Sequence, residues 1–87
     1  MITLETDDIG REVLAIVKRV SRRPVEVFPQ SALAADLGLD SLQSLEFFAE
    51  LEDRFDIVVP LERVPQILTV VEAVECVRSL VAAGARP

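Results

Sequence analysis

Asp36-Leu37-Gly38-Leu39-Asp40-Ser41-Leu42 is the stretch around which this chain is organised, and a run of helix-forming residues follows it to about Phe55. The change from glycine and aspartate to helix formers predicts that a helix begins at or beside Ser41, with Asp40 or Ser41 itself as its N-cap. Backbone N–H groups at a helix start have no partner within the helix, and the positive end of the helix dipole lies there. An anion attached to Ser41 would therefore lie where the backbone favours negative charge.

The predicted helix over residues 41–55 has two apolar stripes at helical spacing. The first is expected to face the core and consists of Ser44, Phe47, Phe48, Leu51 and Phe55. The second consists of Leu42, Leu45 and Ala49, with Glu46, Asp53 and Asp56 between or beside them. A small domain buries only one side of such a helix, so the second stripe is expected to be exposed. It is either a docking face for a partner or an ordinary surface, because single exposed apolar residues are common.

The segments Leu37–Leu42, Leu45-Glu46, Leu51–Ile57 and Pro60 together resemble the acyl carrier proteins of the phosphopantetheine-binding carrier family. The resemblance extends over nearly the whole chain. It implies an all-α fold, a small four-helix bundle with a long first loop and a short third helix. We expect one acyl-carrier domain over residues 1–87, with helices at roughly 6–20, 41–55, 61–66 and 69–83.

Patterns in the rest of the chain agree with this arrangement. Apolar residues at helical spacing from Ile9 to Val20 predict a first helix, with Thr6 as its cap and Pro24 after its end. Thr69 and Glu72 fit a capping box at the start of the last helix, and Gly84 is a plausible left-handed stop.

The sequence also predicts the form of two connecting segments, residues 21–40 and 57–59. Residues 21–40 show no sustained period, and a short helical turn is possible at 31–35. Apolar residues are expected to anchor this connector on the helices: Val25, Phe28, Leu33, Leu37 and Leu39. Residues 57–59 are apolar and β-branched, but a lone strand has nothing to pair with, so they are expected to form an extended connector.

Composition limits the function classes. The 87 residues suit one small domain, and the net charge of −6 disfavours nucleic acid and favours partners with basic surfaces. No apolar run is long enough to span a membrane, and no signal peptide is recognisable, so a cytoplasmic chain is expected. A monomer is also expected. With one cysteine and no histidine, there is no disulfide framework and no metal site. Cys76 is expected to be an inert, partly buried thiol.

Ser41 is the candidate for chemistry, yet it has no neighbouring histidine or lysine that could activate it as a nucleophile. We therefore expect no catalytic residue in this chain. By itself, a serine at a helix start is most often a cap. The resemblance implies instead that Ser41 receives 4'-phosphopantetheine from coenzyme A through a phosphopantetheinyl transferase, and that acyl groups are carried as thioesters on the thiol of that arm.

The resemblance also implies partners, namely the transferase and acyl-loading and condensing enzymes with basic docking patches. The candidate docking residues are Asp40, Leu42, Leu45, Glu46, Ala49 and Asp53. Glu50, Glu52 and Asp56 add to a negative exterior, which either steers basic partners or is simply solvated. The interior side chains form a core, between whose helices a short acyl chain is a further possibility.

Several alternatives stay open. Peptidyl carriers commonly have two glycines and often a histidine before the serine, and Gly38-Leu39-Asp40 is closer to acyl carriers. Arg63 and Val64 make the third helix less acidic than is usual in fatty-acid carriers. Together with the Phe47-Phe48 pair, they favour a discrete secondary-metabolism carrier over housekeeping fatty-acid synthesis, and fatty-acid and polyketide-type biosynthesis both stay open. Outside the family, the alternative is an unmodified acidic helical interaction module.

Overall fold

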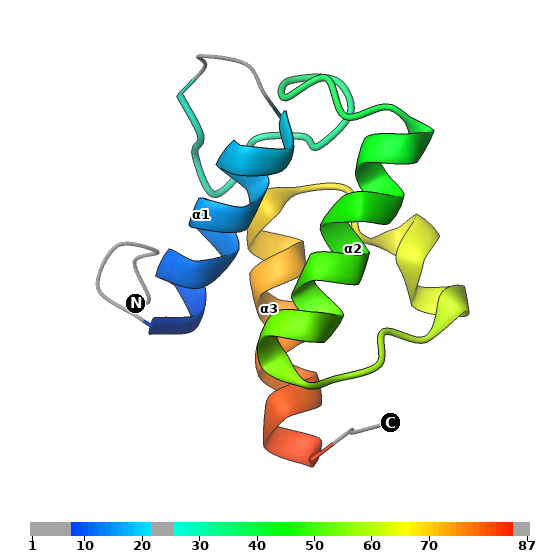
Figure 1. Ribbon diagram of the computed structural model, residues 1–87. Coiled ribbons are helices and arrows are strands. Elements are labelled where there is room, and N and C mark those ends of the chain that lie inside the picture. Colours follow the sequence, from blue (N-terminus) through cyan, green and yellow to red (C-terminus); the bar gives the residue numbers. More distant parts are fainter. Residues whose placement is uncertain (1–7, 22–25, 85–87) are drawn as a thin grey trace.

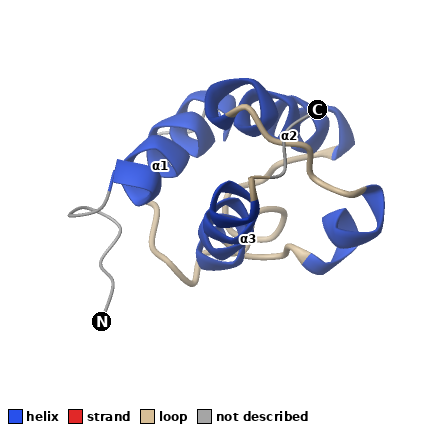
Figure 2. Ribbon diagram, turned by 90° about the horizontal axis from the view of Figure 1, so that it is seen from below, coloured by secondary structure: helices blue, strands red, loops and turns tan. Residues whose placement is uncertain are grey.

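The computed structural model of the protein describes residues 8–21 and 26–84. The described chain contains α1 (Asp8–Ser21), α2 (Ser41–Phe55), the 3₁₀ helix η2 (Leu61–Gln66) and α3 (Val70–Ala83). In Figure 1, α1 runs antiparallel to α2 and α3, and Figure 2 shows α3 nearly end-on beside both. η2 lies on the opposite side of the bundle from α1 (Figures 1 and 2). The expected all-α bundle with a long first loop and a short third helix is confirmed.

The three α-helices meet along the apolar stripes that their sequences predict. Phe47, Phe48 and Leu51 of α2 are buried, whereas Ser44 and Phe55 are only half-buried. On α3, Leu80 rather than Val81 completes the core stripe, because Val81 is 42% exposed. The full set of α1 and α3 core residues is Val13, Leu14, Ile16, Val17, Val20, Val70, Ala73, Val74, Cys76, Val77 and Leu80. Burial of such side chains contributes roughly 1.5–3 kcal/mol each, which makes this the main source of stability.

Helix ends follow local sequence signals closely. Thr69 and Glu72 form the predicted capping box, and Gly84 ends α3 in the left-handed region at φ 67°. Asp56 ends α2 with φ 55°, a conformation that aspartate tolerates better than most residues. The expected cap of α1, Thr6, lies outside the described residues.

The connector between α1 and α2 is ordered by its own turns. Asp36 N–H donates to Ala32 O and Gly38 N–H to Ala34 O, each at 3.0 Å, so residues 32–38 form the short helical turn expected nearby. Leu33, Leu37 and Leu39 are buried, as predicted.

Phe28 does not anchor the connector, and that prediction is wrong because its side chain is 49% exposed. Ser31 N–H donates to Phe28 O, and Phe28 N–H donates to the buried Ser31 hydroxyl, which together fix a tight turn. The neighbouring Val27 packs against the core instead. Val25 lies outside the described residues.

Hydrogen bonds join the connector to the start of α3. Leu33 N–H donates to Leu68 O at 2.9 Å, and Val70 N–H donates to Ser31 O at 3.0 Å. These bonds flank an isolated antiparallel bridge between Ala32 and Thr69. The connector, which leads directly into α2, is thereby held against the start of α3 at one end of the bundle (Figure 1).

Residues 57–60 form an extended connector rather than a strand, as expected. Ile57 and Val59 are buried and Val58 between them is 44% exposed, the alternation of an extended backbone. In the segment that follows, Pro65 lies inside η2, and the helix there takes the 3₁₀ form.

Candidate functional site

The start of α2 is built by a capping box. Gln43 N–H donates to Asp40 Oδ1 at 2.8 Å, and Asp40 N–H donates to Gln43 Oε1 at 3.2 Å. Asp40 is thus the N-cap, with an extended backbone, and Ser41 is the first helical residue. This is one of the two arrangements that the local sequence predicts.

Gly38 places this cap at the end of the connector. Its φ of 70° lies in the left-handed region, which costs glycine little and other residues about 1 kcal/mol or more. The buried side chains of Leu37 and Leu39 on either side hold the turn against the core. The position of Ser41 is therefore set by buried anchors two and four residues before it.

Ser41 itself is exposed, and its hydroxyl has no hydrogen-bond partner among the described residues. The N–H groups of Ser41 and Leu42 belong to the first turn, where a helix offers no acceptor. A phosphate ester on the Ser41 oxygen would meet free backbone donors and the positive end of the α2 dipole. The residues present therefore fit a covalently attached phosphate-linked arm.

The candidate docking residues lie on the exposed side of α2 below Ser41. Leu42 is 65% exposed and Leu45 is 68% exposed, so large apolar side chains face solvent here. Ala49 and Asp53 are also exposed, and Glu46 is half-buried. We call Leu42, Leu45, Glu46, Ala49 and Asp53 the α2 face.

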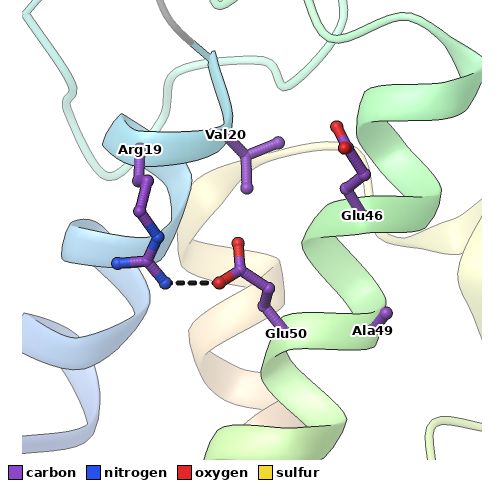
Figure 3. A pocket seen from close by; sticks show the side chains of 5 residues that line it. All are labelled: Arg19, Val20, Glu46, Ala49 and Glu50. Atoms are coloured by element: carbon purple, nitrogen blue, oxygen red, sulfur yellow. Dashed lines mark hydrogen bonds and ion pairs between the residues drawn. The ribbon is translucent and has the colours of Figure 1, made fainter.

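The α2 face borders a groove between α1 and α2. Glu46 and Ala49 line this groove of about 400 Å³ together with Arg19, Val20 and Glu50. Figure 3 shows Arg19 of α1 reaching across to Glu50 of α2, and the two side chains pair at 2.5 Å. A second ion pair, between Arg54 and Glu12, joins the same two helices further along and raises the pKa of the Arg54 guanidinium.

Two acidic residues of α2 have structural contacts that the sequence did not reveal. Glu50 pairs with Arg19, and a Glu52 oxygen accepts a hydrogen bond from Val59 N–H at 2.8 Å. Only part of the expected negative exterior is therefore a simple solvated surface. The partner of Glu50 lies 31 residues away in the sequence, and the partner of Glu52 is a backbone N–H group. No sequence motif predicts contacts of either kind.

An apolar hollow of about 370 Å³ opens on another side of α2. Ser44 and Phe48 form its α2 wall, and the remaining walls come from connector residues 32–35 and from Val64, Ile67 and Leu68. Ser44 lies one helical turn below Ser41, so the hollow begins close to the candidate attachment point. The rings of Phe47 and Phe48 lie 5.3 Å apart; Phe47 is fully buried in the core, whereas Phe48 belongs to the core and also lines the hollow.

Other titratable groups lie away from Ser41. Cys76 is buried and burial raises the pKa of its thiol, as expected for an inert side chain. Within residues 8–21 and 26–84, no cluster of three His, Cys, Asp or Glu side chains could hold a metal ion. Nor is any helix in those ranges both long and apolar enough to cross a membrane.

A family model described as "Phosphopantetheine attachment site" matches residues 11–77, a segment that contains the whole capping box and the α2 face. A relative from Caulobacter vibrioides (strain NA1000 / CB15N), described as "Probable acyl carrier protein", is 41% identical over 64 residues, which is 74% of each chain. The chain belongs to the acyl carrier protein family.

A solved structure agrees with this assignment. The "putative acyl carrier protein" of Mycobacterium tuberculosis superposes with a TM-score of 0.77 at 30% identity, covering 82% of this chain and 96% of that one. Acyl carrier proteins are non-catalytic carriers, and their prosthetic group is a covalently attached 4'-phosphopantetheine.

Proposed function

We propose that this chain is a discrete acyl carrier protein whose Ser41 bears 4'-phosphopantetheine. When attached, that group supplies a terminal thiol on which acyl intermediates are held as thioesters. The observation that carries the proposal is the exposed hydroxyl of Ser41 at the first position of α2, beside free backbone N–H groups. The chain itself catalyses no step in this proposal.

In the attachment step, Ser41 is a substrate of the transferase and not a catalytic group. A bond forms between Ser41 Oγ and a phosphorus atom of coenzyme A, while the pyrophosphate bond of coenzyme A breaks and adenosine 3',5'-bisphosphate leaves. The hydroxyl proton passes to a base of the transferase, because the sequence has no histidine to accept it and no base contacts Ser41 in the described residues. The N–H groups of the first turn of α2 would favour the negative charge of the phosphodiester.

The test is a loading assay on the purified apo chain. We expect one added phosphopantetheinyl group by mass spectrometry after incubation with coenzyme A and a broad-range phosphopantetheinyl transferase. Ser41→Ala should abolish the mass shift, and Ser79→Ala should leave it unchanged, because Ser79 is exposed on α3 away from the cap. No shift in the unsubstituted chain would leave the second candidate, an unmodified acidic interaction module.

The α2 face, together with Asp40, is proposed as the docking surface for the transferase and for acyl-loading and condensing enzymes. Exposed leucines beside acidic side chains suit a partner whose apolar contact is surrounded by lysine or arginine. Single-sign charge also speeds encounter with such a partner, and the effect weakens with salt.

Polyketide-type secondary metabolism is proposed as the setting, in preference to fatty-acid synthesis. The support is the weak acidity of η2, where Arg63 and Val64 stand in the segment that follows the α2 face. Incubation of the loaded chain with acyltransferases of both pathway types would decide between them by relative acylation rate. A cytoplasmic location, a monomeric state and the absence of nucleic-acid partners stay predictions.

A short acyl chain is proposed to rest in the hollow beside Phe48. The hollow is largely apolar, and its volume of about 370 Å³ falls within the range of small-ligand pockets. A butyryl-loaded form should show nuclear Overhauser contacts between the acyl methyl group and the Phe48 ring. An acyl chain without any contact to Phe48, Val64 or Leu68 would contradict this proposal.

A further inference from the structure

Gln43 touches both sides of the junction between α1 and α2, two residues after Ser41. Its Oε1 accepts a hydrogen bond from Asp40 N–H at 3.2 Å. Its Nε2 donates to Val20 O at 3.1 Å and lies 3.5 Å from Ser21 O. One carboxamide therefore completes the cap of α2 and also binds the last carbonyl groups of α1.

The surroundings fix which way the carboxamide points. If oxygen and nitrogen were exchanged, the NH₂ group would face the Asp40 N–H, and the oxygen would face the carbonyl oxygens of α1. Both contacts would then be repulsive, so only the observed orientation satisfies the donors and acceptors.

The two contacts of Gln43 need different chemical groups, an acceptor for the Asp40 N–H and a donor for the α1 carbonyl groups. The final carbonyl groups of a helix lack intrahelical donors, so Val20 and Ser21 require a donor from outside α1. A glutamate at the third helical position can accept from the N-cap N–H, as in the usual capping box. Its carboxylate has no proton for the carbonyl oxygens, so only an amide serves both helices.

This link lies at the end of the bundle where Ser41 is presented. The ion pairs of Arg19 with Glu50 and of Arg54 with Glu12 also join α1 to α2, but they lie further along α2 from its start. The covalent route from Ser21 to Asp40 runs through a long connector. Gln43 therefore makes a side-chain hydrogen bond that ties the first turn of α2 directly to α1.

We propose that Gln43 is a positioning residue for the modification of Ser41, and that it acts by holding the first turn of α2 on the end of α1 through its amide donor. This inference rests on the proposed attachment at Ser41. It predicts that the isosteric Gln43→Glu disturbs loading, even though that change leaves the capping box of α2 intact.

The test compares Gln43→Glu with Gln30→Glu, which makes the same charge change at an exposed turn residue. Loss of one such hydrogen bond should lower kcat/KM for phosphopantetheine loading roughly three- to tenfold in Gln43→Glu. Gln30→Glu should load at the unsubstituted rate. Gln43→Met, which lacks donor and acceptor without adding charge, should load at least as slowly as Gln43→Glu.

Two further measurements separate positioning from direct contact with the transferase. By NMR titration, the new carboxyl group in Gln43→Glu should have a pKa above that of Glu72, which holds the same position in the capping box of α3, because the carbonyl oxygens of Val20 and Ser21 favour its protonated form. The stability deficit of Gln43→Glu relative to Gln30→Glu should accordingly shrink as the pH falls through that pKa. The Asp40 amide should keep its protection from hydrogen exchange in Gln43→Glu and lose it in Gln43→Met.

A pKa of the new carboxyl group as low as that of Glu72, or slow loading without loss of the α1–α2 contact, would overturn the inference. Equal loading rates for Gln43→Glu and Gln30→Glu would overturn it as well. If the unsubstituted chain is not loaded at all, the proposed function fails instead, and the titration and exchange measurements still decide whether the amide link exists.

Discussion

Phe47 shows how strongly a single side chain can matter in a domain of this size. It is fully buried, and its ring lies 5.3 Å from that of Phe48. We expect Phe47→Ala to destabilise the fold by about 3–5 kcal/mol, because both apolar burial and packing are lost. Urea denaturation followed by circular dichroism measures the change.

Phe28 provides the matched control for that substitution. Its side chain is 49% exposed and belongs to a surface turn, so Phe28→Ala should cost less than about 1 kcal/mol. Similar losses for the two variants would contradict the assignment of Phe47 to the core and of Phe28 to the surface.

Glu72 gives a prediction about pH. Hydrogen bonds from the N–H groups of Leu68 and Thr69 and from the Thr69 hydroxyl lower the pKa of its carboxyl group. Its contribution to stability is therefore fully present above the unfolded value of about 4.3 and is lost as the pH falls through the lower folded pKa.

Thermal melts of Glu72→Gln against the unsubstituted chain test this pH dependence. The melting temperatures should differ by a constant amount above about pH 5 and converge in more acidic solution. Glu75→Gln, on the exposed side of the same helix, controls for the lost charge. A difference that persists unchanged in acid would contradict the prediction.

At the residue scale, contacts between residues close in the sequence were predictable, and contacts between different helices were not. The Asp40 cap and the start of α2 at Ser41 follow from signals within a few residues of each other. The contacts of Gln43 with Val20 and Ser21 do not, because they depend on how α1 and α2 pack.

At the element scale, the α2 face makes a prediction about charge. Asp53 lies on the exposed side of α2, so Asp53→Lys should raise the KM for transferase loading by weakening attraction to a basic surface. Glu75→Lys changes charge equally on α3 and should have a smaller effect. Steady-state kinetics at low salt measure both variants.

Salt provides the internal check on that experiment. At about 1 M salt the screening length is only about 3 Å, so the KM difference between Asp53→Lys and the unsubstituted chain should largely disappear. A difference that persists at high salt would point to a shape effect rather than electrostatic attraction.

The helices were predictable as elements because each combines a periodic apolar stripe with its own end signals. Expected and observed bounds agree for residues 41–55 and 61–66, and the last helix begins one residue after its predicted start, with Thr69 as cap. The connector was harder, since two neighbouring apolar residues, Val27 and Phe28, compete for one inward position. The Ser31 turn decides that competition in favour of Val27, and sequence periodicity carries no sign of it.

At the scale of the whole molecule, the number of reactive thiols per chain tests the proposed attachment, because the sequence has a single cysteine, Cys76. Burial keeps this thiol from solvent and raises its pKa, so it should react slowly with Ellman's reagent in the folded apo chain. The proposed holo form should show one fast-reacting thiol per chain, from the arm on Ser41. Both forms should gain one more on unfolding in urea, and a fast thiol in the folded apo chain would contradict this.

The family could be identified from the sequence because its motif is a short, continuous stretch around Ser41. The acyl group and the pathway could not, because they depend on the surfaces of other proteins. The family model matches residues 11–77, so the expectation that residues 1–87 form one domain stays a prediction. Exposure of Leu42 and Leu45 suits partner binding, but two leucine side chains do not specify which partner binds.

The hydrogen bonds between the connector and the start of α3 bear on the time at which the protein matures. Ser31 and Leu33 reach their backbone partners only after residues 68–70 have been synthesised. A chain still emerging from the ribosome would therefore have α2 without the support that presents its first turn. Attachment of the arm should consequently follow completion of translation, so that half-made chains do not consume coenzyme A.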